Sequence, residues 1–102
     1  MAGYWMVRAD ILDSEKQAAY ARLATAAVAK FGGRYLARGG QAESREGSSR
    51  ERLVIIEFPS YAEARAAYDS PAYQQALAVL EGGVTRDFAI VEGLDETAPS
   101  QP

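Results

Sequence analysis

The sequence predicts a single α+β domain in which two helices pack on a small β-sheet. Strand-like and helix-like residue patterns follow one another in the order β-α-β-β-α-β. Glycine pairs at residues 32–33 and 82–83 end both helical stretches, as left-handed helix caps do. A length of 102 residues, 48% hydrophobic and 25% charged, suits one globular domain. We expect that domain to span residues 1–94 and a polar, flexible tail to occupy residues 95–102.

The first half of the chain shows a strand, a long helix and a second strand. Both faces of the strand predicted over residues 3–10 carry apolar residues. A capping box of Ser14 and Gln17 predicts where the helix begins. Residues 34–38 are predicted as the second strand. The apolar face of the helix consists of residues at helical spacing, namely Tyr20, Leu23, Ala24, Ala27, Val28 and Phe31.

The chain is organised around residues 53–58, LVIIEF, whose β-branched apolar run predicts a strand buried on both faces. Residues 41–52 are polar and are expected to form the outer part of a hairpin that leads into this strand. Within that hairpin, Gly39 and Gly40 indicate a bulge or a close backbone approach.

The second helical stretch follows directly. Ser60 and Glu63 form a second capping box. The helix is restarted or kinked at Ser70 and Pro71, because proline suits a first helical position. Residues 88–93 are predicted as the last strand.

This order of elements is the split β-α-β arrangement of the ferredoxin-like fold. We expect a four-stranded antiparallel sheet, with the first and third strands side by side and parallel at its centre. Two helices cover one face, and the other face still carries large apolar residues. Because a second copy can bury that face, we expect a homodimer.

Composition excludes several classes of function. The sequence has no cysteine and no histidine, which removes thiolate chemistry, Ser-His and Cys-His nucleophile pairs and the usual zinc sites. We expect no metal on these grounds, and we also expect no cofactor. A net charge of −3 argues against nucleic-acid binding. Without a leader pattern or a long apolar run, the expected protein is cytoplasmic, of bacterial type, and does not bind membranes.

Five segments resemble one known family in order and spacing. They are GYW at 3–5, GGRYLARGG at 32–40, IIEFPS at 55–60, YDSPAYQ at 68–74 and DFAIVEG at 87–93. The chain resembles, over residues 3–94, the family catalogued as domain of unknown function 1330 (DUF1330). The resemblance implies the dimeric α/β barrel superfamily, in which two such sheets pack face to face. That superfamily includes cofactor-free monooxygenases, isomerases, cyclases and ligand-binding modules. DUF1330 itself has no settled activity, so the resemblance implies a fold and a pocket but no reaction.

The sequence departs from the family pattern at three places. Ala67 stands where a tryptophan is typical, and Leu80 where an arginine is frequent. The hairpin at 47–51 lacks the usual tryptophan and proline and is one residue shorter. If the family's arginine helps to hold an anion, the departure at Leu80 implies an altered specificity.

Charged residues near the central strand are the first candidates for a site. Burial of Glu57 would raise its pKa and suit it to general acid or base catalysis, or it forms a structural ion pair with Arg8 or Arg38. Arg38 and the backbone amide of Gly39 can together hold a carboxylate or phosphate, or they form a bulge. Arg34 is a weaker candidate of the same kind.

Tyrosines are the second source of candidates. Aromatic residues at strand and helix spacing usually pack in a core, but one or two can direct a hydroxyl into an apolar pocket. The candidate catalytic residues are therefore Glu57, Arg38 and Tyr68, and the candidate ligand-binding residues are Arg8, Arg34, Gly39, Tyr20 and Tyr73.

Two functional hypotheses remain open. The first is a cofactor-free enzyme of the isomerase, cyclase, lyase or monooxygenase type, acting on a small carboxylated or aromatic metabolite. The second is a ligand-binding or stress-related dimer without catalysis. RNA binding by an exposed sheet is disfavoured because the basic balance and the paired aromatics of RNA-binding sheets are lacking.

Overall fold

The computed structural model describes residues 1–95, so the predicted tail beyond Asp95 lies outside the described residues. Three helices and four strands follow one another along the chain. They are β1 (Gly3–Ile11), α1 (Ser14–Lys30), β2 (Arg34–Arg38), β3 (Arg52–Phe58), α2 (Tyr61–Asp69), α3 (Pro71–Leu80) and β4 (Val84–Glu92).

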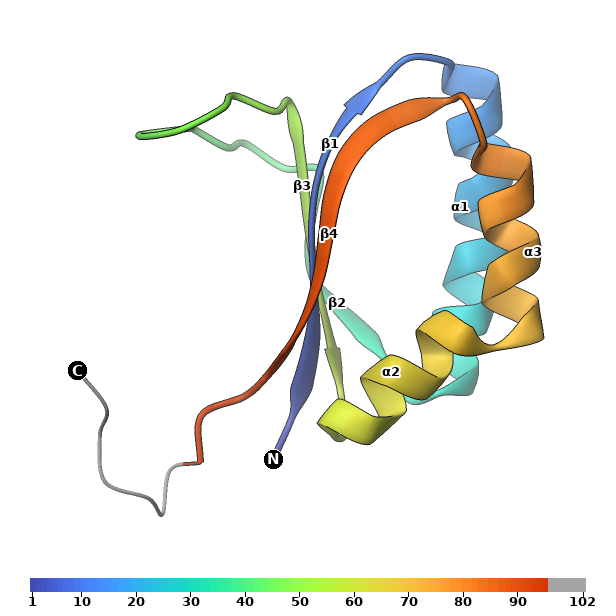
Figure 1. Cartoon of the computed structure of the whole chain (residues 1–102), viewed down its shortest axis with the longest axis vertical. Helices are drawn as coiled ribbons and strands as arrows, with labels where there is room; N and C mark the ends of the chain where they lie inside the picture. The colour runs from blue at the N-terminus through green and yellow to red at the C-terminus, as the bar shows by residue number, and fades with distance from the viewer. Residues whose placement is uncertain (96–102) are drawn as a thin grey trace.

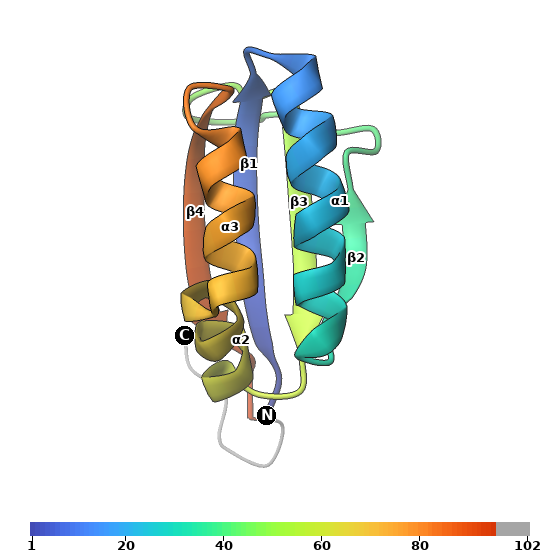
Figure 2. The ribbon, with the colours of Figure 1, turned by 90° about the vertical axis from the view of Figure 1, so that its right-hand side faces the viewer.

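The four strands form one sheet in the order β2-β3-β1-β4, and every neighbouring pair is antiparallel. This confirms the predicted ferredoxin-like fold. The first and third strands are adjacent as expected, but the prediction that they run parallel is wrong. A helix joins β1 to β2, so those two strands share a direction, and β3 lies between them in the opposite direction. The three helices cover one face of the sheet and leave the other open (Figures 1 and 2).

Local sequence signals define both ends of α1. Its N-cap is Asp13, whose carboxylate accepts from the amides of Glu15 and Lys16, so the prediction of a Ser14 capping box is wrong by one residue. At the other end, Gly32 has φ +76°, and the amide of Gly33 donates to the Val28 carbonyl at 2.9 Å. These bonds form a Schellman motif, which confirms the predicted glycine stop.

The break between α2 and α3 lies at Ser70, as predicted. This residue ends α2 and is also the N-cap of α3, where its hydroxyl accepts from the Tyr73 amide at 3.2 Å. Pro71 occupies the first turn of α3, where its missing N–H is not needed. The Ser60 side chain caps α2 by accepting from the Glu63 amide at 3.0 Å.

Two boundaries differ from the sequence prediction. β4 begins at Val84 rather than at residue 88. The segment 39–51, here called the arm, contains no assigned strand and projects from the sheet on the side opposite the helices (Figure 1). The bulge lies between Tyr35 and Ala37. At Gly39, where φ is +67°, the Arg52 guanidinium instead fills the space that a side chain would take.

The core lies between the sheet and the helices and centres on Trp5, which is 1% exposed. Its ring centroid is 4.7 Å from that of Tyr73, 4.9 Å from Phe58 and 5.1 Å from Phe88. Its indole N–H donates to the Ala64 carbonyl at 2.8 Å, which attaches β1 to α2. Within residues 1–95, none of the helices is long and apolar enough to cross a membrane.

Replacing Trp5 should therefore destabilise the domain more than any surface substitution does. We expect Trp5→Ala to lower the free energy of unfolding by about 3–5 kcal/mol, the usual cost of deleting a buried Trp side chain. Val79→Ala, on the exposed side of α3, is the control and should change it by less than about 0.5 kcal/mol. Urea unfolding measures both; an equal effect of the two variants would contradict this account of the core.

Candidate functional site

A cavity lies between the helix-facing side of the sheet and α1. The volume accessible to water within it is about 40 Å³, enough for about three water molecules at roughly 10–15 Å³ each. Apolar floor residues come from β1 and β3, and the polar side chains come from four elements. These polar lining residues are Gln17, Tyr20, Tyr35, Arg38, Arg52 and Arg86. None of the described lining residues is acidic, so the cavity is cationic.

Arg86 of β4 is the most buried of these cations. Its guanidinium donates to the Tyr20 hydroxyl at 3.3 Å and to the Tyr73 hydroxyl at 3.1 Å. It also lies 5.3 Å from the ring centroid of Tyr20 and 5.0 Å from that of Phe88, within cation–π range. Among residues 1–95 it has no carboxylate partner. A half-buried arginine whose charge is met only by neutral groups is typical of an anion site.

The electrostatics of this cluster keep Arg86 charged and Tyr73 neutral. Desolvation by burial lowers the pKa of Arg86, but the Tyr73 and Tyr20 hydroxyls raise it by more. Burial, together with the neighbouring Tyr20, raises the pKa of the Tyr73 hydroxyl well above its ordinary value. Tyr73 is therefore a hydrogen-bond donor and acceptor at neutral pH, and not a general base.

The hydroxyl protons of Tyr20 and Tyr73 can be counted. The two oxygens are 2.6 Å apart, so one proton lies between them, while both oxygens accept from Arg86. The second proton has no recorded acceptor among the described residues. Tyr73 is fully buried, whereas Tyr20 lines the cavity. When Tyr73 donates to Tyr20, the Tyr20 O–H is free to donate to a bound oxygen atom.

Arg38 of β2 lies at the more exposed end of the cavity. Its guanidinium stacks on the Tyr35 ring, 3.7 Å from the centroid, and donates to the Thr25 hydroxyl of α1 at 2.5 Å. The predicted anion-holding arginine is thus at a cavity, and its charge is likewise not paired with a carboxylate in the described residues. The prediction that the Gly39 amide helps to hold an anion is wrong, because that N–H donates to the Leu53 carbonyl at 2.9 Å.

Glu57 lies on the opposite, open face of the sheet. Its carboxylate accepts from Arg34 at 2.8 Å and from the Tyr4 hydroxyl at 3.2 Å, and 26% of its side chain is exposed. The Arg34 hydrogen bond, with help from Tyr4, lowers the pKa of Glu57 against the opposing effect of desolvation. The predicted raised pKa is therefore wrong. An ion pair is present, but its partner is Arg34 rather than Arg8 or Arg38.

The structure does not bring the three candidate catalytic residues together. Glu57 and Arg38 are on opposite faces of the sheet, and Tyr68 packs in the aromatic core, its ring centroid 5.1 Å from that of Phe88. Of the candidate ligand-binding residues, Tyr20 lines the cavity. Tyr73 does not line it but forms a hydrogen bond with the Tyr20 hydroxyl. The positions of departure from the family pattern, Ala67 and Leu80, are both buried in the core.

The candidates predicted from the sequence for a small-molecule site include neither Arg86 nor Arg52. Arg86 precedes residue 88, the predicted start of the last strand, so the prediction places it on neither face of the sheet. Extending that strand back to Val84 places Val84, Arg86, Phe88 and Ile90 on one face by simple alternation. From that alternation, Arg86 could have been predicted to face the helices.

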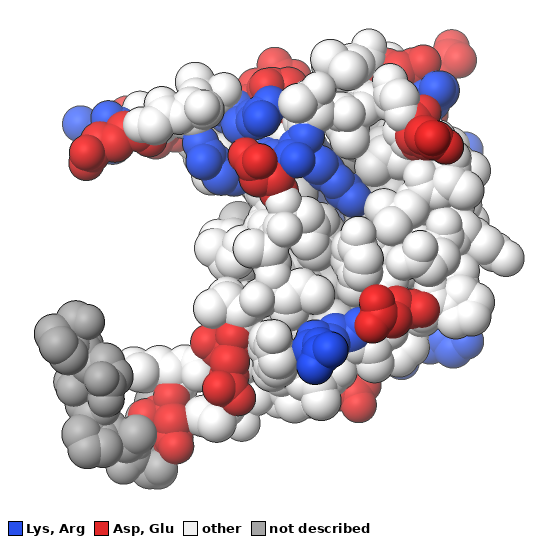
Figure 3. All heavy atoms as spheres, in the orientation of Figure 1, with Lys and Arg blue, Asp and Glu red and all other residues white. Residues whose placement is uncertain are grey.

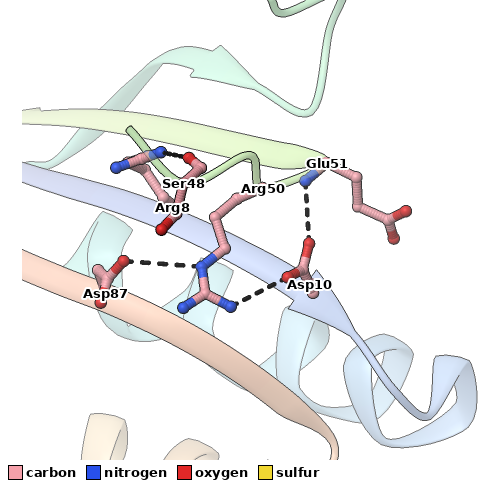
Figure 4. Close-up of polar contacts among 6 residues, drawn as sticks. All are labelled: Arg8, Asp10, Ser48, Arg50, Glu51 and Asp87. Atoms are coloured by element: carbon pink, nitrogen blue, oxygen red, sulfur yellow. Dashed lines mark hydrogen bonds and ion pairs between the residues drawn. The ribbon is translucent and has the colours of Figure 1, made fainter. Parts of the chain in front are cut away.

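A second polar cluster attaches the arm to the open face (Figure 4). Arg50 donates to the Asp10 carboxylate at 3.0 Å and lies 3.6 Å from that of Asp87. The Glu51 amide also donates to Asp10, at 3.1 Å, and the Arg8 guanidinium donates to the Ser48 carbonyl. The backbone hydrogen bond from Glu51 and the Arg50 side chain lower the pKa of Asp10. Arg50 is paired with Asp10, and Arg8 bonds to the backbone of the arm, so we assign this cluster to holding the arm.

The described residues contain no group of three or more acidic side chains placed to hold a metal ion. The polar side chains that line the cavity are three arginines, two tyrosines and one glutamine. Such a set suits an anion rather than a cation.

An antiparallel four-stranded sheet with helices on one face and a cavity between the layers defines a ferredoxin-like α+β protein. Residues 2–94 match the family described as "Domain of unknown function (DUF1330)", and the chain belongs to this family. The sequence has no match among the curated proteins.

Three solved structures illustrate the fold. The RPA0582 protein of unknown function from Rhodopseudomonas palustris has a TM-score of 0.75 at 18% identity, over 92% of this chain and 83% of that one. SnoaB, a cofactor-independent oxygenase from Streptomyces nogalater, has a TM-score of 0.62 at 18% identity, over 97% of this chain and 98% of that one. A dimeric ferredoxin-like protein of unknown function from Bacteroides fragilis has a TM-score of 0.55 at 15% identity, over 90% and 96%. At these identities the likeness is one of fold.

The Asp10 contacts give a prediction about the arm. Asp10→Asn removes the charge that holds Arg50, so trypsin should cleave after Arg45 in the arm faster than in the wild type at neutral pH. Asp69→Asn, at the exposed end of α2, is the control and should leave the cleavage rate unchanged. Because the folded-state pKa of Asp10 is lowered, its contribution is complete above the unfolded-state pKa and is lost as the pH falls through the folded-state value. Equal cleavage rates in wild type and Asp10→Asn would show that the arm is held by other contacts.

Proposed function

We propose that the cavity binds a small carboxylated or aromatic metabolite as its anion. The observation that carries this proposal is Arg86, a half-buried cation that meets only tyrosine hydroxyls and aromatic rings. A bound carboxylate or phenolate oxygen would accept from Arg86 and from the free proton of Tyr20. Apolar and aromatic walls from Trp5, Val7 and Ile56 would contact the rest of the ligand.

A cofactor-independent enzyme is the second candidate, and the Arg86–Tyr20 pair favours it. Donors fixed in a cavity that largely excludes water stabilise negative charge as it develops on oxygen, which enolate and phenolate chemistry requires. The described lining residues include no carboxylate that could abstract a proton, so the substrate would have to be acidic itself. The fold shared with SnoaB, a cofactor-independent oxygenase, is compatible with such a reaction. Oxygen uptake with phenolic acids, compared between wild type and Tyr20→Phe, would test this candidate.

We also propose that the protein is a homodimer through the open face of the sheet. Cross-strand neighbours on that face form an apolar row of Met6, Ile55 and Ala89, and Met6 is 40% exposed. Figure 3 shows the middle of the open side, at the left, as uncharged, with charged side chains of both signs above it and acidic side chains below it. Exposed apolar surface of this kind marks an interface, and dimeric proteins occur among the structural neighbours.

Removal of the Arg86 charge tests the anion site. We expect Arg86→Met to weaken benzoate binding at least about tenfold, because a hydrogen bond to a charged group contributes about 1.5–3 kcal/mol. The same variant should be as thermally stable as the wild type or more so, because it removes a half-buried charge without an ionic partner. Amide NMR titration measures the affinity, and thermal unfolding measures the stability. Arg22→Met, an exposed arginine of α1, is the control. A variant that loses stability and keeps its affinity would make Arg86 a structural residue.

A charge on the apolar row tests the dimer. Ile55→Glu should convert the protein to monomers, because two carboxylates would face each other in an interface that excludes water. Leu23→Glu, at an exposed apolar position of α1, should leave the dimer intact. Sedimentation velocity distinguishes the two states, and a wild-type protein that sediments as a monomer would refute the proposed dimer.

A further inference from the structure

Two arginines of the cavity lie in one row across the sheet. Ala9 of β1 is paired with Arg52 of β3 on one side and with Arg86 of β4 on the other. All three residues line the cavity. Neighbouring strands are about 4.8 Å apart, so the Cα atoms of the two arginines are separated by about 10 Å.

The two guanidinium groups have separate contacts. That of Arg52 lies against Gly39, at the β2 side of the sheet, whereas that of Arg86 reaches the tyrosine hydroxyls of α1 and α3. Ala9, which is 6% exposed, is the residue between the two arginines in this row. Because the groups have separate contacts and start from strands two places apart, a single carboxylate is poorly placed to bridge both arginines. Each is positioned for an anion of its own.

Arg52, like Arg86, has no carboxylate partner in the part of the chain that the structure describes. On the open face, by contrast, Arg34 and Arg50 are both paired with acids. The third arginine of that face, Arg8, donates to the Ser48 carbonyl. Two like charges that face one apolar floor repel each other, and a ligand with two negative charges would relieve that repulsion.

We propose that the ligand is a small dicarboxylate. One carboxylate binds Arg86 and the Tyr20 hydroxyl at the inner end, and the other binds Arg52 at the outer end, with Arg38 beside it. The chain between the two carboxylates lies over Ala9 and Val7. This inference rests on the proposed function and specifies its ligand class. The small volume accessible to water limits the ligand to a short chain whose outer acid lies among the more exposed arginines.

The test compares each diacid with a ligand of the same shape and one charge fewer. Succinate, glutarate and adipate are titrated by amide NMR against their monoamides. For the best-fitting length we expect the diacid to bind about tenfold more tightly, the effect of about 1.4 kcal/mol from a second charged contact. In Arg38→Gln/Arg52→Gln the diacid affinity should fall to that of the monoamide, which Arg86 still holds. Arg22→Gln/Arg65→Gln, at two exposed positions outside the cavity, is the charge-matched control and should preserve the preference.

Two outcomes would overturn the dicarboxylate. In the first, the monoamides bind the wild type as tightly as the diacids. In the second, the preference for diacids survives in the double variant. The proposed anion site stands in both cases if benzoate binding still depends on Arg86. Loss of that dependence would instead refute the anion site itself, so the two failures are distinguishable.

Discussion

The packing around Trp5 is the constraint on which the rest of the structure depends. This residue lies in the first half of β1, contacts rings from β3, α3 and β4, and holds α2 through its hydrogen bond to Ala64. The position of Tyr73 follows from this packing, because its ring is fixed on one side by Trp5 and its hydroxyl on the other by Tyr20. Arg86 can be held half-buried only because these two hydroxyls are already in place. The proposed anion site is therefore an extension of the hydrophobic core.

Strand alternation sorts the charges of the sheet into two populations. On the open face, Arg34 and Arg50 meet acids, in the Arg34–Glu57 and Arg50–Asp10 pairs, and Arg8 meets the Ser48 carbonyl. On the helix-facing side, Arg52 and Arg86 meet neutral groups. The same residue type thus serves the structure on one face and is left available for a ligand on the other. Identifying which arginines lack an acid carries more functional information here than identifying which acids are present.

Much of the fold is predictable from the sequence because local signals set its boundaries. The Gly32–Gly33 stop, the Ser70–Pro71 break and the β-branched run before Pro59 each depend on near neighbours in sequence. The site depends on which face a residue occupies, and there one misplaced boundary matters. Starting the last strand at residue 88 hid the alternation that contains Arg86. Glu57 was chosen because its neighbours are apolar, yet on its own face it lies beside Tyr4 and Arg34, a pairing fixed only by strand register.

The cavity is cationic inside a protein whose net charge is −3, and this contrast limits how an anion can be recognised. At physiological ionic strength, fields from exposed charges decay over about 8 Å, so the acidic surface neither attracts nor strongly repels a small anion. Recognition must then come from contacts at the cavity itself, where desolvated hydrogen bonds from Arg86 and Tyr20 are strong. Such contacts depend on geometry more than on total charge. Selectivity among small acids should therefore follow the number and spacing of their oxygens.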